Sequence, residues 1–152
     1  MQSRRDMLKS SAGLAAMLAG LGLLPAVAQA NYAAAAFDAK TMADLMKALG
    51  GSAPTESKDV TIQGPDIAEN GAVVPVGCAT TLAGVKKMLL LVEKNPAMLC
   101  AMFDVSDAVE ASFNTRVKMG QSSDVYAVAM MADGRVLYAK KEVKVTLGGC
   151  GG

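Results

Sequence analysis

The sequence predicts a mainly β protein: an immunoglobulin-like β-sandwich of about seven strands with a short N-terminal helix and a flexible C-terminal arm. Apolar residues recur with helical spacing near residue 40 and alternate with a period of two after residue 60. Turn signals separate the later apolar runs, and the sequence closes on GGCGG. We therefore expect an export signal over residues 1–30, the sandwich domain with its helix over 31–147, and the arm over 148–152.

The composition excludes several classes of function. A formal net charge of +1 argues against a nucleic-acid binder, which needs a basic patch. The absence of histidine removes His-ligated metal sites, Ser-His-Asp triads and imidazole acid–base catalysis. The sequence has no tryptophan and 4% aromatic residues, which disfavours stacking platforms for bases. Three cysteines remain as the distinctive chemistry.

The first thirty residues resemble a twin-arginine export signal. Arg4 and Arg5 precede an apolar run, Leu14–Leu24, and Ala28-Gln29-Ala30 has the pattern of a cleavage site. The alternative, a transmembrane anchor, needs a longer run to span about 30 Å of hydrocarbon. Cleavage removes three of 15 basic and one of 14 acidic residues, which leaves 122 residues with a formal net charge of −1. We expect a periplasmic protein that does not remain in the membrane.

Twin-arginine export moves proteins that are already folded. The usual reasons are a cofactor inserted before export or a partner that has no signal of its own. Because this sequence offers few cofactor ligands, we expect no cofactor and a folded partner subunit that travels with the chain.

A single helix is predicted over Phe37–Leu49, with Asp38 as its N-cap and Gly50 as its end. Its methionines have core spacing and are interpreted as packing rather than as metal ligands. A linker follows over Gly50–Pro54. The apolar residues with helical spacing are Met42, Leu45, Met46 and Leu49.

The β region divides into short runs. Pro75 places the second strand at a sheet edge, and Asp133-Gly134 predicts a hairpin. Residues 97–105 are apolar on both faces, so they either cover the helix or bury against a partner, and the export argument favours the partner. The predicted strands are Val60–Ile62, Ala72–Thr80, Met88–Glu93, Ala97–Val105, Phe113–Met119, Asp124–Ala132 and Arg135–Leu147.

The last five residues carry the predicted site. Gly148, Gly149, Gly151 and Gly152 surround Cys150. A disordered tail with an incidental thiol is the alternative, but an exposed thiol is a hazard in an oxidising compartment. Glycines give the tether access to narrow channels, and the three residues after Leu147 span at most about 10–11 Å. No neighbouring group in the sequence activates the thiol, so we expect a non-catalytic carrier with no catalytic residue of its own.

This ending resembles the SoxY family, the sulfur-carrier subunits of the periplasmic Sox thiosulfate-oxidising system. The resemblance covers essentially the whole chain. Its other motifs are Glu69-Asn70-Gly71, Val74-Pro75-Val76, Glu93-Lys94-Asn95-Pro96, Thr115-Arg116, Ala132-Asp133-Gly134 and Lys141–Thr146.

The resemblance implies an immunoglobulin-like fold and a heterodimer with a SoxZ-like subunit. It implies that Cys150 accepts a thiosulfate-derived group as a cysteine S-thiosulfonate, formed by a c-type cytochrome complex. A sulfate-releasing hydrolase, and in some organisms a sulfane dehydrogenase, would then act on the adduct.

Cys78 and Cys100 do not belong to the family's motif. They are either two buried thiols, a disulfide, or a sulfur relay to Cys150.

Four other functions remain to be weighed. A ubiquitin-like carrier that forms a thiocarboxylate on Gly-Gly needs cytoplasmic activation, against the export signal. A periplasmic thiol redox protein would need a Cys-x-x-Cys pair. A metal chaperone would need methionines clustered with the thiols. Prenylation would need a C-a-a-X box.

Overall fold

A computed structural model describes residues 34–147 of the chain. The predicted export signal, with Arg4 and Arg5, and the predicted arm, with Cys150, lie outside the described residues.

Two helices precede the strands, where the sequence predicted one. They are α2 (Ala34–Phe37) and α3 (Met42–Leu49). The N-cap of α3 is Thr41, not the predicted Asp38, because the Thr41 hydroxyl oxygen accepts the Asp44 N–H at 3.1 Å. This cap starts α3 at Met42, five residues after the predicted start at Phe37, and α2 is an additional helix that shares only Phe37 with the predicted one. Gly50 ends α3 in the left-handed conformation, with φ 69°, as predicted.

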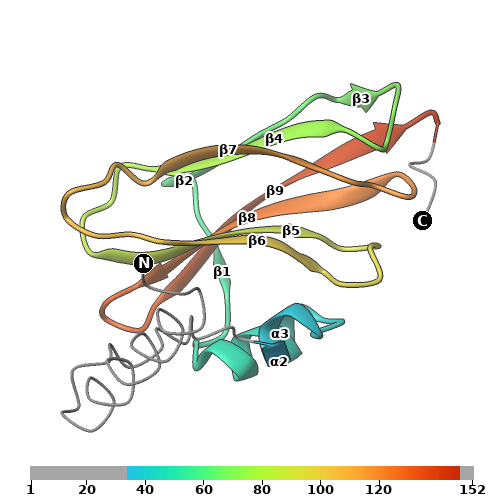
Figure 1. The fold of residues 1–152 in the computed structure, drawn as a ribbon. Helices are drawn as coiled ribbons and strands as arrows, with labels where there is room; N and C mark the ends of the chain where they lie inside the picture. Colours follow the sequence, from blue (N-terminus) through green and yellow to red (C-terminus); the bar gives the residue numbers. More distant parts are fainter. Residues whose placement is uncertain (1–33, 148–152) are drawn as a thin grey trace, which may run out of the picture. The chain divides into compact units, whose positions relative to one another are not determined.

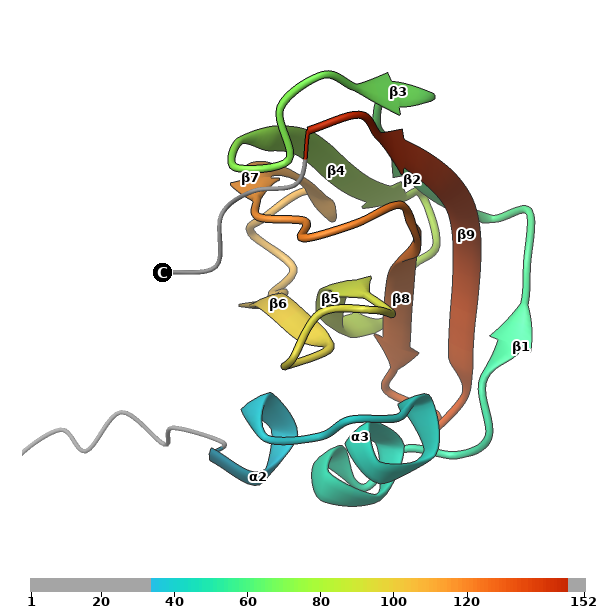
Figure 2. The same cartoon turned by 90° about the vertical axis from the view of Figure 1, so that its right-hand side faces the viewer.

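The strands form two layers, and Figures 1 and 2 show α2 and α3 on the outer side of one of them. The larger sheet has the order β1-β9-β8-β5-β6, and β3 also pairs with β9. Its strands are β1 (Thr55–Glu56), β3 (Ile67–Ala68), β5 (Val85–Val92), β6 (Leu99–Asp104), β8 (Ser123–Met131) and β9 (Val136–Val145). The smaller sheet, in the order β2-β4-β7, contains β2 (Val60–Gln63), β4 (Val74–Thr80) and β7 (Ser112–Val117).

These two sheets confirm the predicted mainly β sandwich. The seven longer strands correspond to the seven predicted ones, and the hairpin between β8 and β9 turns at Asp133-Gly134, where Gly134 has φ 88°. The strands β1 and β3 have two residues each, which is too short for a periodic signal in the sequence. Both pair with β9 in parallel.

The prediction that Pro75 marks an edge strand is wrong. The strand β4 is the centre of its sheet, between β2 and β7. However, β2 pairs with β4 only from Gly77 to Thr80, so at Pro75 the strand has a partner only in β7, through Arg116. The missing N–H of proline is tolerated because β4 is an edge locally.

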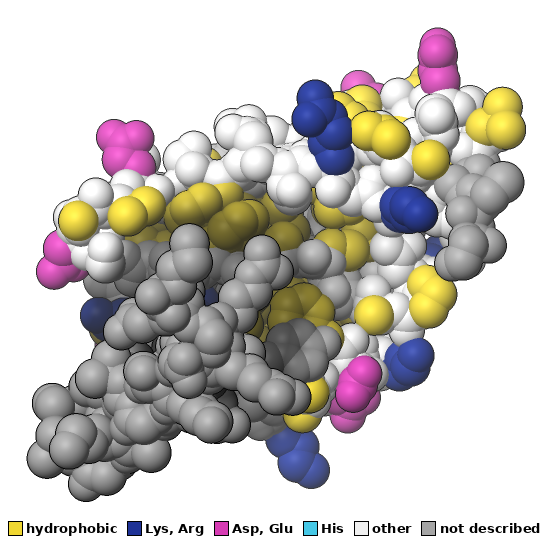
Figure 3. All heavy atoms as spheres, in the orientation of Figure 1, with side chains coloured by type: hydrophobic (Ala, Val, Ile, Leu, Met, Phe, Trp, Pro, Cys, Tyr) yellow, Lys and Arg dark blue, Asp and Glu magenta, His cyan; other side chains and the backbone are white. Residues whose placement is uncertain are grey.

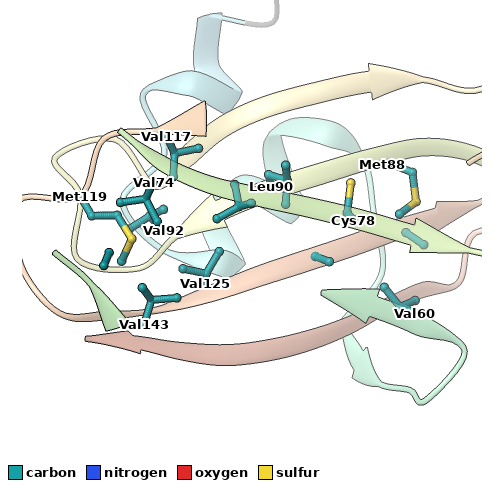
Figure 4. Packing of buried hydrophobic residues seen from close by; sticks show 14 of the residues in the cluster. Val60, Val74, Cys78, Met88, Leu90, Val92, Val117, Met119, Val125 and Val143 are labelled. Carbon is teal, nitrogen blue, oxygen red and sulfur yellow. The ribbon is translucent and has the colours of Figure 1, made fainter. Parts of the chain in front are cut away.

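The strand β5 is buried on both faces. Leu90 lies in the core between the two sheets, which Figure 4 shows, while Leu89 packs beneath the helices with Leu45. All three side chains are 0% exposed. Met98 and Leu99, from the predicted strand with two apolar faces, join the cluster beneath the helices. Of the two explanations for that apolar surplus, the structure supports the helix cover for these residues.

Within residues 34–147, no helix has both the length and the hydropathy needed to cross a membrane.

Candidate functional site at the root of the C-terminal segment

The last strand, β9, leads directly to the segment that carries the predicted site. Its register with β8 ends at the pair Ser123↔Val143, and Val143 is 1% exposed. The described chain continues to Leu147, three residues before Cys150. The structure therefore shows how the origin of the predicted arm is held.

An anchor segment, defined here as Asp66–Gly71, runs beside the end of β9 (Figure 2). Lys144 donates its backbone N–H to the Asp66 carbonyl at 2.9 Å, and Thr146 donates to the Ala68 carbonyl at 3.1 Å. Gly71 donates in return to the Leu147 carbonyl at 2.7 Å. The Thr146 hydroxyl adds a bond to the Glu69 carbonyl at 3.1 Å. The anchor segment thus holds the backbone of β9 beyond its pairing with β8.

The anchor segment is tied to the body of the domain in turn. The Gly71 carbonyl accepts the N–H of Met119 at 2.7 Å, and Met119 is 0% exposed. Lys141 Nζ lies 2.8 Å from Asp66 Oδ1 and donates to the Gly64 carbonyl at 2.7 Å. The hydrogen bond and the positive charge of Lys141 lower the pKa of Asp66. Backbone bonds and an ion pair therefore hold the same short segment.

Three large apolar side chains of this root and of the residues next to it are exposed, and we call them the collar: Ile67, Val73 and Leu147. They are 58%, 54% and 71% exposed. Ile67 pairs with Lys144 in the register of β3 and β9. The hydrogen bond between the Gly71 N–H and the Leu147 carbonyl holds Leu147 beside Gly71, which precedes Val73 by two residues. Figure 3 shows apolar side chains on the surface at the end of the domain where β3 and β9 lie. Exposed apolar residues gathered at one place are typical of an interaction surface.

Sequence reasoning did not assign a role to the anchor segment. Its signal was present in Asn70-Gly71, which belongs to one of the family motifs. In the structure the Asn70 Oδ1 accepts the N–H of Ala72 at 2.9 Å and closes a turn. That turn directs the Gly71 N–H toward Leu147. The pairing with the end of β9 is a long-range contact, which a local motif does not reveal.

Cys78 and Cys100 are free thiols, so the alternative of a disulfide between them is wrong. Cys78 lies on β4 and is 1% exposed, and burial raises the pKa of its thiol to about 11. Cys100 lies half-buried on β6, and burial raises its pKa as well, although Asn95 Nδ2 contacts its sulfur at 3.7 Å. Both thiols stay protonated at neutral pH, which suits packing and disfavours a sulfur relay.

No group of three or more His, Cys, Asp or Glu side chains in the part of the chain that the structure describes is arranged to hold a metal ion.

Comparison with known proteins adds the identity of the family. The model of the family described as "Sulfur oxidation protein SoxY" matches residues 45–150, which include the anchor segment, β9 and Cys150. No curated protein sequence matches the chain.

Two solved structures show the same fold. The sulfur carrier protein SoxY from Chlorobium limicola f thiosulfatophilum is 31% identical, with a TM-score of 0.61, and the match covers 68% of this chain and 93% of that one. The superoxide reductase (neelaredoxin) from Ignicoccus hospitalis is 18% identical, with a TM-score of 0.51, over 57% of this chain and 79% of that one. At that identity the second likeness shows the fold alone.

The family match extends over 106 of the 152 residues, counted from 45 to 150, and the likeness to the Chlorobium carrier covers more than two thirds of the chain. This chain belongs to the SoxY family of sulfur oxidation proteins.

Proposed function

We propose that this chain is a non-catalytic sulfur carrier that holds intermediates of thiosulfate oxidation as covalent adducts on Cys150. The observation that carries the proposal is the family match, which includes Cys150, combined with the anchored backbone of Leu147, which follows β9 and lies three residues before Cys150. A carrier needs a reactive group on a short tether and a rigid base. The anchor segment supplies the base, and Gly148, Gly149, Gly151 and Gly152 supply a tether without side chains.

The length of the tether determines how an enzyme can reach the thiol. Three residues extend at most about 10–11 Å from Leu147 to Cys150. An active site that receives Cys150 must therefore bring its entrance against the surface around Leu147, where the collar lies. The occupant that we propose for the collar is the entrance of the enzymes that process the adduct.

The proposed cycle begins with an oxidation at the thiol. The Cys150 sulfur forms a bond to the outer sulfur of thiosulfate, the thiol proton is released, and two electrons pass to a c-type cytochrome complex. Water then attacks the terminal sulfonate in a hydrolase, which releases sulfate and two protons and leaves the persulfide anion on Cys150.

The remaining sulfane sulfur needs a second enzyme. A sulfane dehydrogenase oxidises it with three waters, removing six electrons and six protons, and gives an S-sulfonate. A second hydrolysis returns the free thiol and sulfate. The partners supply the activation in every step, because no neighbouring group in the sequence activates the Cys150 thiol.

We also propose that residues 1–30 direct twin-arginine export to the periplasm, and that a SoxZ-like subunit travels with the chain as a heterodimer. Arg4 and Arg5 before an apolar run support the first part, and membership of the family supports the second.

The test uses the mature chain with its partner subunit, thiosulfate and the cytochrome complex. Mass spectrometry of the peptide that contains Cys150 should find an adduct that a reductant removes. The Cys150→Ser variant should lack the adduct, while the matched control Cys100→Ser should keep it. An adduct confined to Cys78 or Cys100, or normal thiosulfate turnover by Cys150→Ser, would overturn the proposal.

A further inference from the structure

We propose that the anchor segment, Asp66–Gly71, sets the length and the starting point of the Cys150 tether, and that Thr146 is a positioning residue for it. This inference rests on the proposed role of Cys150 as the attachment site.

The pairing of β9 shows why the tether needs an anchor. Its last partner in β8 is opposite Val143, so pairing with β8 leaves the backbone from Lys144 onward unpaired. The anchor segment instead binds the backbones of Lys144, Thr146 and Leu147, and the Ser122 hydroxyl accepts the N–H of Val145 at 2.9 Å. Each of the four residues after Val143 therefore has a backbone hydrogen bond.

The anchor shortens the tether. Without it, the last backbone hydrogen bond is that of Val145 to Ser122, so five residues lead to Cys150 with a reach of about 16–18 Å, instead of three residues and about 10–11 Å from Leu147. The effective concentration of a tethered group falls roughly as the −3/2 power of tether length, which gives about a twofold loss from three residues to five. A shorter tether thus keeps the thiol concentrated near the collar.

Thr146 joins β9 to the anchor segment twice. Its backbone N–H bonds to Ala68 and its hydroxyl bonds to Glu69. The residue is exposed, so it contributes little to core packing. Its contacts therefore serve the position of the chain end rather than the stability of the core.

A graded series of variants tests the assignment on the mature chain with its partner subunit. Thr146→Pro removes both bonds, Thr146→Val removes only the hydroxyl bond, and Thr146→Ser keeps both. A matched control inserts two Gly/Ser residues between Leu147 and Gly148, which lengthens the tether from three residues to five with the anchor intact.

Two readouts are compared across the series. Amide hydrogen exchange at Gly71 should be slow in the natural chain and in Thr146→Ser, and at least tenfold faster in Thr146→Pro. In hydrolysis of the Cys150 adduct by the partner hydrolase, KM should rise about twofold for Thr146→Pro and for the insertion. Thr146→Val should lie between, and kcat should stay the same, because the bound adduct reacts as before.

Three results would overturn the inference: unchanged protection of Gly71 in Thr146→Pro, an unchanged KM in Thr146→Pro despite fast exchange, or an unchanged KM with the insertion. Thr146→Val decides the matter if Thr146→Pro does not fold. Failure of the proposed function looks different, since the natural chain would then form no adduct on Cys150.

Discussion

Gly71 and Leu147 are joined by a backbone hydrogen bond of 2.7 Å, in which the Gly71 N–H donates to the Leu147 carbonyl. The carbonyl of the same glycine accepts the N–H of Met119, whose side chain is fully buried. One residue thus connects the end of β9 to the core between the sheets. The segment that carries Cys150 therefore starts from a position set by the packed interior.

The collar gives the first prediction. Replacing both Ile67 and Val73 by serine should raise KM for the enzymes that process Cys150 several-fold, because the short tether brings their entrances against this surface. Both side chains are more than half exposed, so the melting temperature should change little. The steady-state kinetics of adduct hydrolysis measure the effect.

Val109 provides the control for the collar. It is the fourth large exposed apolar residue of the described chain, at 47%, and its loop between β6 and β7 lies at the end of the sandwich away from β3 (Figure 1). Val109→Ser should leave KM unchanged. Equal effects of both substitutions would show that the collar is not the contact surface.

The thiols give the second prediction. With a pKa of about 11, Cys78 is ionised in about one molecule in a thousand at pH 8, whereas a thiol of ordinary pKa near 8.5 is about one quarter ionised. Iodoacetamide at pH 8 should therefore modify Cys150 first, and Cys78 only when the protein unfolds. Mass spectrometry of the three cysteine peptides over time, with and without denaturant, measures the order. Early modification of Cys78 in the folded protein would contradict its burial.

The ion pair at the root of the tether gives the third prediction. Lys141 lowers the pKa of Asp66 below its usual value of 3.8. A depressed carboxyl pKa adds stability that is present above pH 3.8 and is lost as the pH falls through the folded-state value. The Asp66 carboxyl, followed by NMR, should titrate below 3.8, and Lys141→Met should return it toward 3.8. An unchanged titration in that variant would show that Lys141 is not the cause.

The sequence predicted those elements that depend on local patterns. The seven longer strands and the turns at Gly50 and Asp133-Gly134 follow from period and turn chemistry, and the structure has them. The predicted start of the helix is wrong because Thr41, and not Asp38, is the N-cap, a choice that spacing alone does not decide. The prediction that Pro75 marks an edge strand is wrong because β2 covers only the second half of β4, and where β2 ends is not visible in the local sequence around Pro75.

The candidate site divides in the same way. Cys150 and its glycines stand out in the sequence because their composition is unusual. The anchor segment does not, because its bonds join residues more than seventy positions apart, such as Thr146 and Glu69. Pairings of that kind depend on the register of the whole sandwich, which a single sequence does not display.

The two faces of β5 give the fourth prediction. Leu90→Ala leaves a cavity between the sheets, and Leu45→Ala leaves one beneath the helices, opposite Leu89. Each change should lower the free energy of unfolding by about 2–5 kcal/mol, the usual range for a buried leucine. Because one strand lines both clusters, the helices and the sandwich should unfold in a single transition in either variant. Urea titrations measure this when they are followed by far-ultraviolet circular dichroism for the helices and by the near-ultraviolet signal of the stacked pair Phe103 and Phe113, which packs against the core between the sheets. A Leu45→Ala protein in which the helical signal is lost first, at an unchanged midpoint for the sheets, would show that the helices are an appendage rather than part of the core.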